Sequence, residues 1–207
     1  MNRKIVIGTL ITVSLVAFSA CGGGGSSVSS SKGYYLDSAV EGVSYQCGSK
    51  SGVTEADGSF EFENGQNCQF ELAGLTLREV SSTNLHADVE IIEDNMDVAK
   101  LLQSLDYDGN PDNGIQINSA VKEELKAYIH ESGAKHVKDV SDDEVLNSII
   151  DDIHKKHPDS HSHLRSEAEV KAHLEKTKAK HAEKHKDDDE DHSKDNDKDH
   201  DKDNDNR

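Results

Sequence analysis

The residues best suited to bind a cation lie in one loop between Leu105 and Ile117. Oxygen-bearing side chains recur there at alternate positions: Asp106, Asp108, Asn110 and Asp112. They match positions one, three, five and seven of an EF-hand, a spacing that lets oxygens surround Ca²⁺. The loop departs from an EF-hand at position six, which is Pro111 in place of Gly, and at position twelve, which is Ile117 in place of Glu.

This pattern predicts a loose calcium turn of weak affinity. The alternative is a plain polar turn, because Asn110-Pro111-Asp112-Asn113 has good type I turn chemistry. Three clustered carboxylates without a cation or a basic neighbour would repel one another, and this favours the cation.

Histidines form a second candidate site, because His154, His157, His161 and His163 fall within ten residues. Neutral imidazoles bind Zn²⁺, Ni²⁺ or Cu²⁺, and neighbouring aspartates can add oxygen ligands. The alternative is a set of solvated surface histidines that become charged partners for carboxylates at mild acidity. No His-Glu-x-x-His or cysteine-rich spacing accompanies them.

The sequence contains no Gly-x-Ser-x-Gly, phosphate-binding loop or dinucleotide fingerprint. We therefore expect a protein that is not an enzyme. Its formal net charge of -18 repels phosphate backbones, so nucleic acid is not an expected partner.

The amino terminus has the layout of a secretory signal: basic Arg3 and Lys4, an apolar run from Ile5 to Phe18, then Ser19-Ala20-Cys21. The small residues before Cys21 resemble the bacterial lipobox, although Phe18 stands where Leu is commonest. This resemblance implies a signal peptide over 1–20, lipid on Cys21 and, since Gly22 follows, export to the outer membrane. Residues 21–32 would form a flexible Gly/Ser tether. The alternative is an ordinary signal peptide with a chance cysteine.

If lipid occupies Cys21, Cys47 and Cys68 remain in a compartment that permits disulfides. We expect them to be bonded, which would stabilise the fold by roughly 3 kcal/mol. The alternative is two buried free thiols.

The strands and helices that must position these sites can be predicted from the spacing of apolar residues along the sequence. This spacing predicts an α+β fold. Alternating apolar residues over 33–80 predict a small antiparallel β-sandwich or partly open barrel. A helical subdomain is expected over 81–178, with the Asp-rich loop at 106–114, although 85–92 is ambiguous. Residues 179–207 are acidic and rich in histidine, and we expect them to form a disordered tail. The helices are expected at 96–105, from Asn118 or Ser119 to about His130, from the capping box at 141–144 to about Lys156, and from a second capping box at 166–169.

Two stretches, Asp37-Ser38-Ala39-Val40-Glu41-Gly42-Val43-Ser44-Tyr45 and Gly52-Val53-Thr54-Glu55-Ala56-Asp57-Gly58-Ser59-Phe60-Glu61-Phe62, carry a further resemblance. They resemble β modules of Gram-negative secreted and surface proteins and are similar to carboxypeptidase-regulatory-like and Cna-B-like sandwiches. The resemblance implies a stalk, spacer or binding scaffold.

Together these features predict a lipid-anchored, non-enzymatic envelope lipoprotein that binds divalent cations. Ca²⁺ would bind at the Asp-rich loop, and the His/Asp-rich C-terminal segment is a further candidate site for transition metals. The alternative is a surface adhesion or assembly module with only structural calcium or none. The expected partners are the membrane, divalent cations and an unknown protein or surface ligand.

Overall fold

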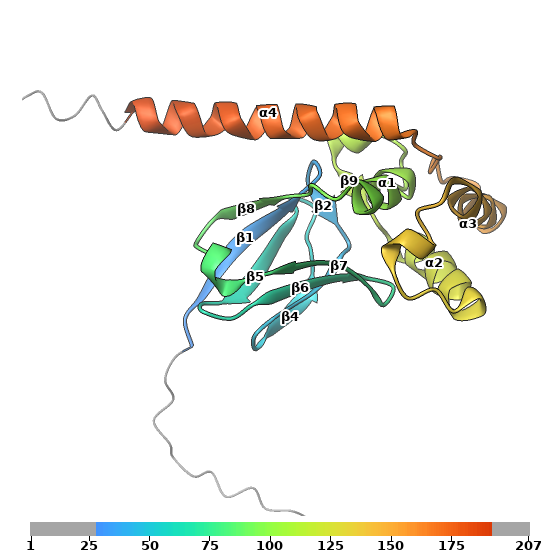
Figure 1. Ribbon diagram of the computed structural model, residues 1–207, viewed down its shortest axis with the longest axis horizontal. Coiled ribbons are helices and arrows are strands. Elements are labelled where there is room, and N and C mark those ends of the chain that lie inside the picture. The colour runs from blue at the N-terminus through green and yellow to red at the C-terminus, as the bar shows by residue number, and fades with distance from the viewer. Residues whose placement is uncertain (1–27, 192–207) are drawn as a thin grey trace, which may run out of the picture.

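The computed structural model describes residues 28–191. The signal peptide, Cys21, most of the tether and residues 192–207 lie outside the described residues, so the predictions for them stay predictions. Within this range the fold is α+β, as predicted, with most strands preceding the helices (Figure 1).

The strands are short. They are β1 (Ser30–Leu36), β2 (Val40–Glu41), β3 (Ser44–Cys47), β4 (Lys50–Val53), β5 (Ser59–Glu63), β6 (Cys68–Leu72), β7 (Leu75–Val80), β8 (Val89–Ile92) and β9 (Ile115–Gln116). The α-helices are α1 (Met96–Ser104), α2 (Ser119–Ser132), α3 (Asp143–Lys156) and α4 (Glu167–Asp191), with 3₁₀ turns η1 (Ser82–Asn84), η2 (Pro111–Asn113) and η3 (Val137–Asp139).

Two sheets form the β-sandwich. One is antiparallel with the order β4-β3-β6-β7, and the other has the order β5-β1-β8. Aromatic side chains join them, since Phe70 of β6 stacks on Tyr35 of β1 at 4.8 Å and meets Phe60 of β5 edge-on at 4.9 Å. Apolar residues at alternate positions therefore face inward, as the alternation predicts.

The predicted disulfide is present. Cys47 of β3 and Cys68 of β6 lie directly opposite each other in the antiparallel pair and are bonded. Both are buried, so the bond ties the two central strands of the larger sheet within the core.

Two strand pairs are parallel and were not foreseen: β1 with β8, and β2 with β9. Both β8 and β9 come from the stretch assigned to the helical subdomain. One cluster of buried residues also includes Phe62 of the sheet, Leu101 of α1 and Leu125 of α2. The two predicted parts therefore both contribute side chains to one buried core.

The helices begin where short polar side chains cap them. Asn95 accepts hydrogen bonds from Asp97 N and Val98 N at the start of α1, and Asn118 caps α2. Helix α3 is capped by Asp142, because the expected cap Ser141 is buried and donates to Asp97 Oδ1 instead. The predicted box of Ser166 and Glu169 opens α4.

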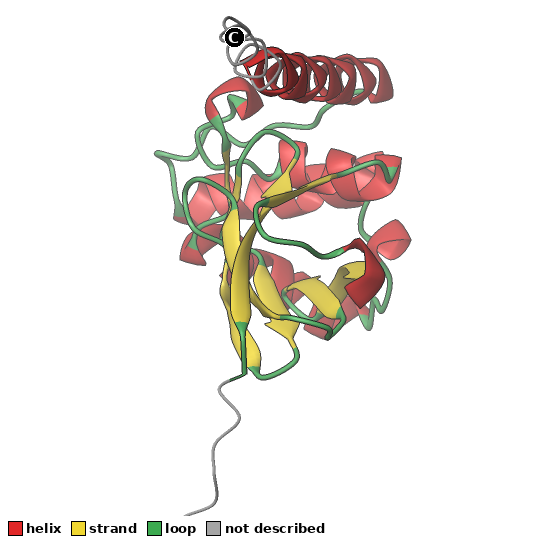
Figure 2. Ribbon diagram, turned by 90° about the vertical axis from the view of Figure 1, so that its left-hand side faces the viewer, coloured by secondary structure: helices red, strands yellow, loops and turns green. Residues whose placement is uncertain are grey.

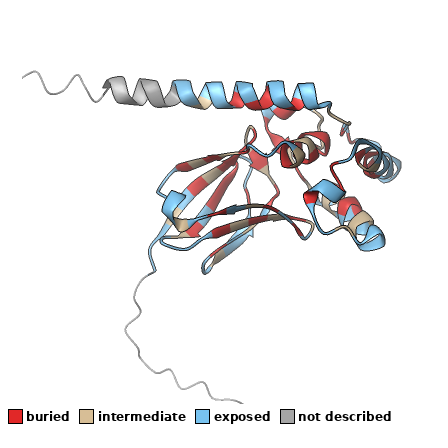
Figure 3. Ribbon diagram, in the orientation of Figure 1, coloured by how far each residue is buried: buried red, intermediate tan, exposed pale blue. Residues whose placement is uncertain are grey.

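Helix α4 extends much further than expected. It continues to Asp191 and so includes residues 179–191, which we expected to belong to the tail. It crosses the top of the molecule in Figures 1 and 2, while β1 begins at the opposite end. Over residues 167–183, where burial is described, the buried residues of α4 lie in its first turns, beside α1 (Figure 3). They are Val170, His173, Leu174 and Thr177.

Candidate functional site: the Asp-rich loop

The Asp-rich loop connects α1 to β9 and is held at both ends. Leu105, Ile115 and Ile117 are buried, which fixes the loop against the core. The Tyr107 N–H donates to Gln116 O at 3.0 Å and closes the loop across its base. Pairing of β9 with β2 then attaches the loop to the sandwich.

Asp106 is the most unusual residue of the loop. It is 0% exposed, and its Oδ1 accepts a hydrogen bond from Gln116 N at 2.9 Å. Its Oδ2 is buried without a hydrogen-bond partner among the described residues. Burial, with a further contribution from Asp108, raises the pKa of Asp106 to about 7.

Asp108 lies within hydrogen-bonding reach of Asp106 and has several donors of its own. Its Oδ1 accepts from Asn110 N at 2.9 Å, and its Oδ2 accepts from Asn113 Nδ2 at 2.9 Å and Gln116 Nε2 at 3.1 Å. Burial acts to raise the pKa of Asp108, but the hydrogen bonds outweigh it and leave that pKa below its usual value. A carboxylate offers about four lone-pair sites, so both carboxylates retain room for a shared proton or cation.

The other two predicted oxygen ligands do not converge on this pair. Asn110 meets the pair through its backbone N–H, a donor that bonds Asp108 Oδ1, and the residue itself is exposed. Asp112 turns toward α4, where its Oδ1 lies 3.2 Å from His173 Nδ1 and its Oδ2 lies 2.6 Å from Lys176 Nζ. The Lys176 ammonium in particular lowers the pKa of Asp112. The loop therefore brings two of its four predicted ligands together.

A segment that sequence reasoning did not assign to the site encloses the loop. The His161 N–H donates to Tyr107 O at 2.8 Å, Ser162 Oγ donates to Asp106 O at 3.0 Å, and Arg165 Nη2 donates to Gly109 O at 2.6 Å. The short polar residues at 160 and 162 carry no periodic signal that could have revealed this role.

Gly109 is required at this contact. Its φ is +71°, and a Cβ there would lie 2.4 Å from His161 O. Only glycine combines the left-handed backbone with such a close approach.

The candidate histidines are spread out. His154 is exposed on α3, His157 ends that helix, and His161 and His163 flank buried Ser162. His163 Nδ1 lies 3.0 Å from His161 O, a backbone oxygen, and is not directed at another imidazole. Within residues 28–191 as described, no group of three or more His, Cys, Asp and Glu side chains is arranged to hold a metal ion.

A Ser-His-Asp arrangement is present at the base of α4. Ser38 Oγ lies 3.2 Å from His173 Nε2, and His173 Nδ1 contacts Asp112. Acyl transfer would also need N–H donors aimed at a substrate oxygen, but the Ser38 N–H donates to Thr177 Oγ1 at 3.4 Å. The adjoining hollow of about 310 Å³ is lined by Asp112 and His173 but not by Ser38. These contacts therefore fit a role for Ser38 in holding α4 against the rest of the fold better than a role as a nucleophile.

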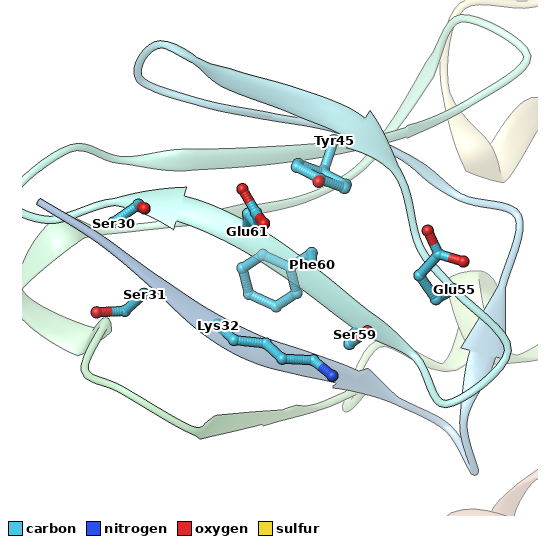
Figure 4. A pocket seen from close by; sticks show the side chains of 8 residues that line it. All are labelled: Ser30, Ser31, Lys32, Tyr45, Glu55, Ser59, Phe60 and Glu61. Carbon is cyan, nitrogen blue, oxygen red and sulfur yellow. The ribbon is translucent and has the colours of Figure 1, made fainter. Parts of the chain in front are cut away.

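A separate hollow of about 450 Å³ opens between the two sheets (Figure 4). Tyr45 and Phe60 supply aromatic surface, and hydroxyl and charged groups surround them. Its lining residues are Ser30, Ser31, Lys32, Tyr45, Glu55, Ser59, Phe60 and Glu61. The hollow reaches the first residues of β1, where the tether would join, and extends along β1 and β5 to Ser59 and Glu55 (Figure 4).

Among the described residues, no helix is both long enough and apolar enough to cross a membrane. No family model, curated protein or solved structure matches the chain. The resemblances to a lipobox and to bacterial β modules therefore rest on the motif residues alone.

Proposed function

We propose that this protein is a non-enzymatic envelope lipoprotein, anchored through lipid on Cys21, that binds a divalent cation of the Ca²⁺ class in the Asp-rich loop. The signal-like amino terminus and the Gly/Ser stretch before β1 support the anchor. The site would then lie on the folded body, beyond the tether, in the extracytoplasmic compartment.

The observation that carries the cation proposal is the buried Oδ2 of Asp106. Burying an ionised carboxylate oxygen without a partner is costly, whereas a proton or a cation shared with Asp108 would satisfy it. At neutral pH and above the proton is increasingly lost, since the pKa of Asp106 is about 7. A cation would then offset the repulsion between the two carboxylates.

The expected affinity is low. Ca²⁺ takes six to eight oxygens, and the Asp106–Asp108 pair supplies only part of that shell, leaving the remainder to water or a rearranged loop. We therefore expect a dissociation constant of roughly 10⁻⁴ to 10⁻³ M, as in other extracellular calcium modules. Exposed His154, His161 and His163, together with the acidic C-terminal segment, would add weaker sites for Zn²⁺, Ni²⁺ or Cu²⁺.

Calorimetry with Ca²⁺ tests the loop. The wild type should give saturable heat, and Asp106→Asn should lose it while keeping an acceptor oxygen for Gln116 N. Asp151→Asn, at an exposed position on α3, is the matched control and should bind as the wild type does. Absence of heat with the wild type, together with an unchanged melting temperature in chelator, would overturn the cation proposal.

Lipid labelling tests the anchor. Cells that express the full chain should incorporate labelled palmitate into it, and Cys21→Ser should abolish the label and release the protein from membranes. Unchanged membrane retention of Cys21→Ser would contradict lipid anchoring.

The hollow between the sheets favours a second candidate, a surface adhesion or assembly module. Its aromatic wall and surrounding hydroxyl and carboxylate groups have the mixed character of ligand sites. A photocrosslinking amino acid at Ser31 should then capture an envelope component in cells, whereas the same group at exposed Thr83 should not. Equal capture at both positions would remove the support for this candidate.

A further inference from the structure

We propose that Asn64 is a site of spontaneous deamidation and that its conversion loosens the junction between the predicted tether and β1. The Gly65 nitrogen loses its proton and attacks the side-chain carbonyl carbon of Asn64, and the side-chain amide nitrogen takes up a proton and leaves as ammonia. Water then opens the resulting succinimide ring at either of its carbonyl carbons, which leaves aspartate or isoaspartate. The reaction needs only water, and neither a cation nor a lipid takes part.

The chain contains two Asn-Gly pairs, Asn64-Gly65 and Asn113-Gly114. Glycine favours this reaction because it has no side chain to shield the attacking nitrogen. The sequence therefore marks both pairs alike, and the surroundings of each pair in the fold decide which one reacts.

The first pair lies in an open turn between β5 and β6. Both residues are exposed, and a Cβ at Gly65 would meet nothing within 4 Å. Gln66 N donates to Glu63 O at 3.2 Å and the φ of Gly65 is +82°, which match a type II turn. No hydrogen bond from the Gly65 N–H to another described residue is present. The attacking nitrogen is therefore accessible, and no bond to it has to break first.

The second pair is held in the Asp-rich loop. The Asn113 side-chain amide donates to Asp108 Oδ2 at 2.9 Å. Gly114 is buried, and its N–H donates to Pro111 O at 3.4 Å. Reaction there requires a local opening that breaks both hydrogen bonds, one of them to a charged group. We therefore expect Asn64 to react at least about tenfold faster than Asn113.

Asn64 also holds the start of β1. Its backbone N–H donates to Ser29 O at 3.0 Å, and its Nδ2 donates to Ser29 Oγ at 3.1 Å. Ser29 is exposed and directly precedes β1, within the predicted tether. Deamidation removes the Nδ2 donor, and isoaspartate also adds a methylene group to the backbone of the turn. Both changes weaken the attachment of Ser29, so the first residues of β1 should exchange their amide hydrogens faster.

Peptide mapping by mass spectrometry tests the site on the full chain, aged at mildly alkaline pH. The fraction converted to aspartate or isoaspartate is followed over time at both pairs. In the folded protein Asn64 should convert at least about tenfold faster than Asn113. In guanidinium chloride the two should convert at similar rates, because the contacts that protect Asn113 are lost.

Asn64→Gln is the matched control for the effect on the junction. Glutamine keeps a side-chain amide, but the ring that it would form with the next backbone nitrogen is larger and forms far more slowly. Aged wild type should show faster amide exchange over residues 29–31 than fresh protein, and aged Asn64→Gln should not.

Two results would contradict the proposal. Conversion at Asn64 no faster than at Asn113 in the folded protein would show that the open turn does not favour the reaction. Conversion at Asn64 with unchanged exchange over residues 29–31 would show that the modified residue still holds the junction.

Discussion

Replacing Asp37 by asparagine should remove the loss of stability with rising pH that comes from this carboxyl, while the similar contribution of Asp106 remains. Asp37 is 0% exposed, and Gln103 Nε2 donates to both of its oxygens at 3.1 and 2.9 Å. Burial nevertheless dominates and raises the pKa of Asp37 from 3.8 to about 7, with a smaller contribution from the Glu93 carboxylate. The amide in Asp37→Asn carries no charge at any pH and keeps one acceptor oxygen for Gln103.

The sign follows from proton linkage. A carboxyl whose pKa is higher in the folded protein binds its proton more tightly there than in the unfolded chain. Its contribution to stability is complete below pH 3.8 and is lost as the pH rises through about 7. The gap between these two pKa values corresponds to roughly 4 kcal/mol in the free energy of unfolding.

Chemical denaturation at pH values from 4.5 to 8.5, followed by circular dichroism with the disulfide intact, measures this effect. At the acid end the wild type and Asp37→Asn should have similar free energies of unfolding. At the alkaline end the free energy of unfolding of the variant should exceed that of the wild type by about a few kcal/mol. His173 lies 3.5 Å from Asp37, and burial is the main cause that lowers its pKa. A histidine with a lowered pKa makes the folded state more stable as the pH rises, which is opposite to the effect of Asp37. His173 is present in both proteins, so comparing them at each pH largely cancels its own titration. Parallel stability curves for the two proteins would refute the reasoning.

Three further predictions concern stability. Cys47→Ser combined with Cys68→Ser should lower the free energy of unfolding by about 3 kcal/mol, and reductant should destabilise the wild type but not this variant; an unaffected wild type in reductant would contradict it. Gly109→Ala should lower the free energy of unfolding by roughly 2 kcal/mol or more, measured by thermal or chemical unfolding. The reason is that φ is +71° at this position and that His161 O is too close for a Cβ. Gly65→Ala is the control, because a Cβ there has no such close neighbour, and it should lower the free energy of unfolding less. Leu174→Ala, at a position 4% exposed in the small α4 cluster, should speed amide exchange in α4 far more than in the sandwich; equal acceleration in both parts would show that α4 does not open separately.

Features set by neighbours in the sequence could be predicted closely. The caps at Asn95 and Asn118 and the box at Ser166 depend on residues within a few positions, and they are where the sequence indicates them. The inward faces of the strands also follow from simple alternation. Pairing of Cys47 with Cys68 was predicted from the proposal that lipid occupies Cys21, because these are the other two cysteines of the chain.

Features set by contacts between distant segments could not be predicted. The pairing of β2 with β9 joins residues far apart in the chain, and both strands are too short to show a period. The redirection of Asp112 depends on His173 and Lys176, which only the docking of α4 brings to it. Spacing alone therefore identified the residues of the loop but not which of them face one another.

The comparison of Asp37 with Asp106 shows why geometry has to decide which buried carboxyl is a candidate ligand. Each is 0% exposed and has a pKa raised to about 7, mainly by burial. Gln103 Nε2 donates to both oxygens of Asp37, so that group is accommodated within the fold. Asp106 has one oxygen bonded and the other without a partner among the described residues, with Asp108 beside it. A perturbed pKa marks both residues, but only Asp106 has an oxygen left for a cation, and we therefore assign the proposed site to it and not to Asp37.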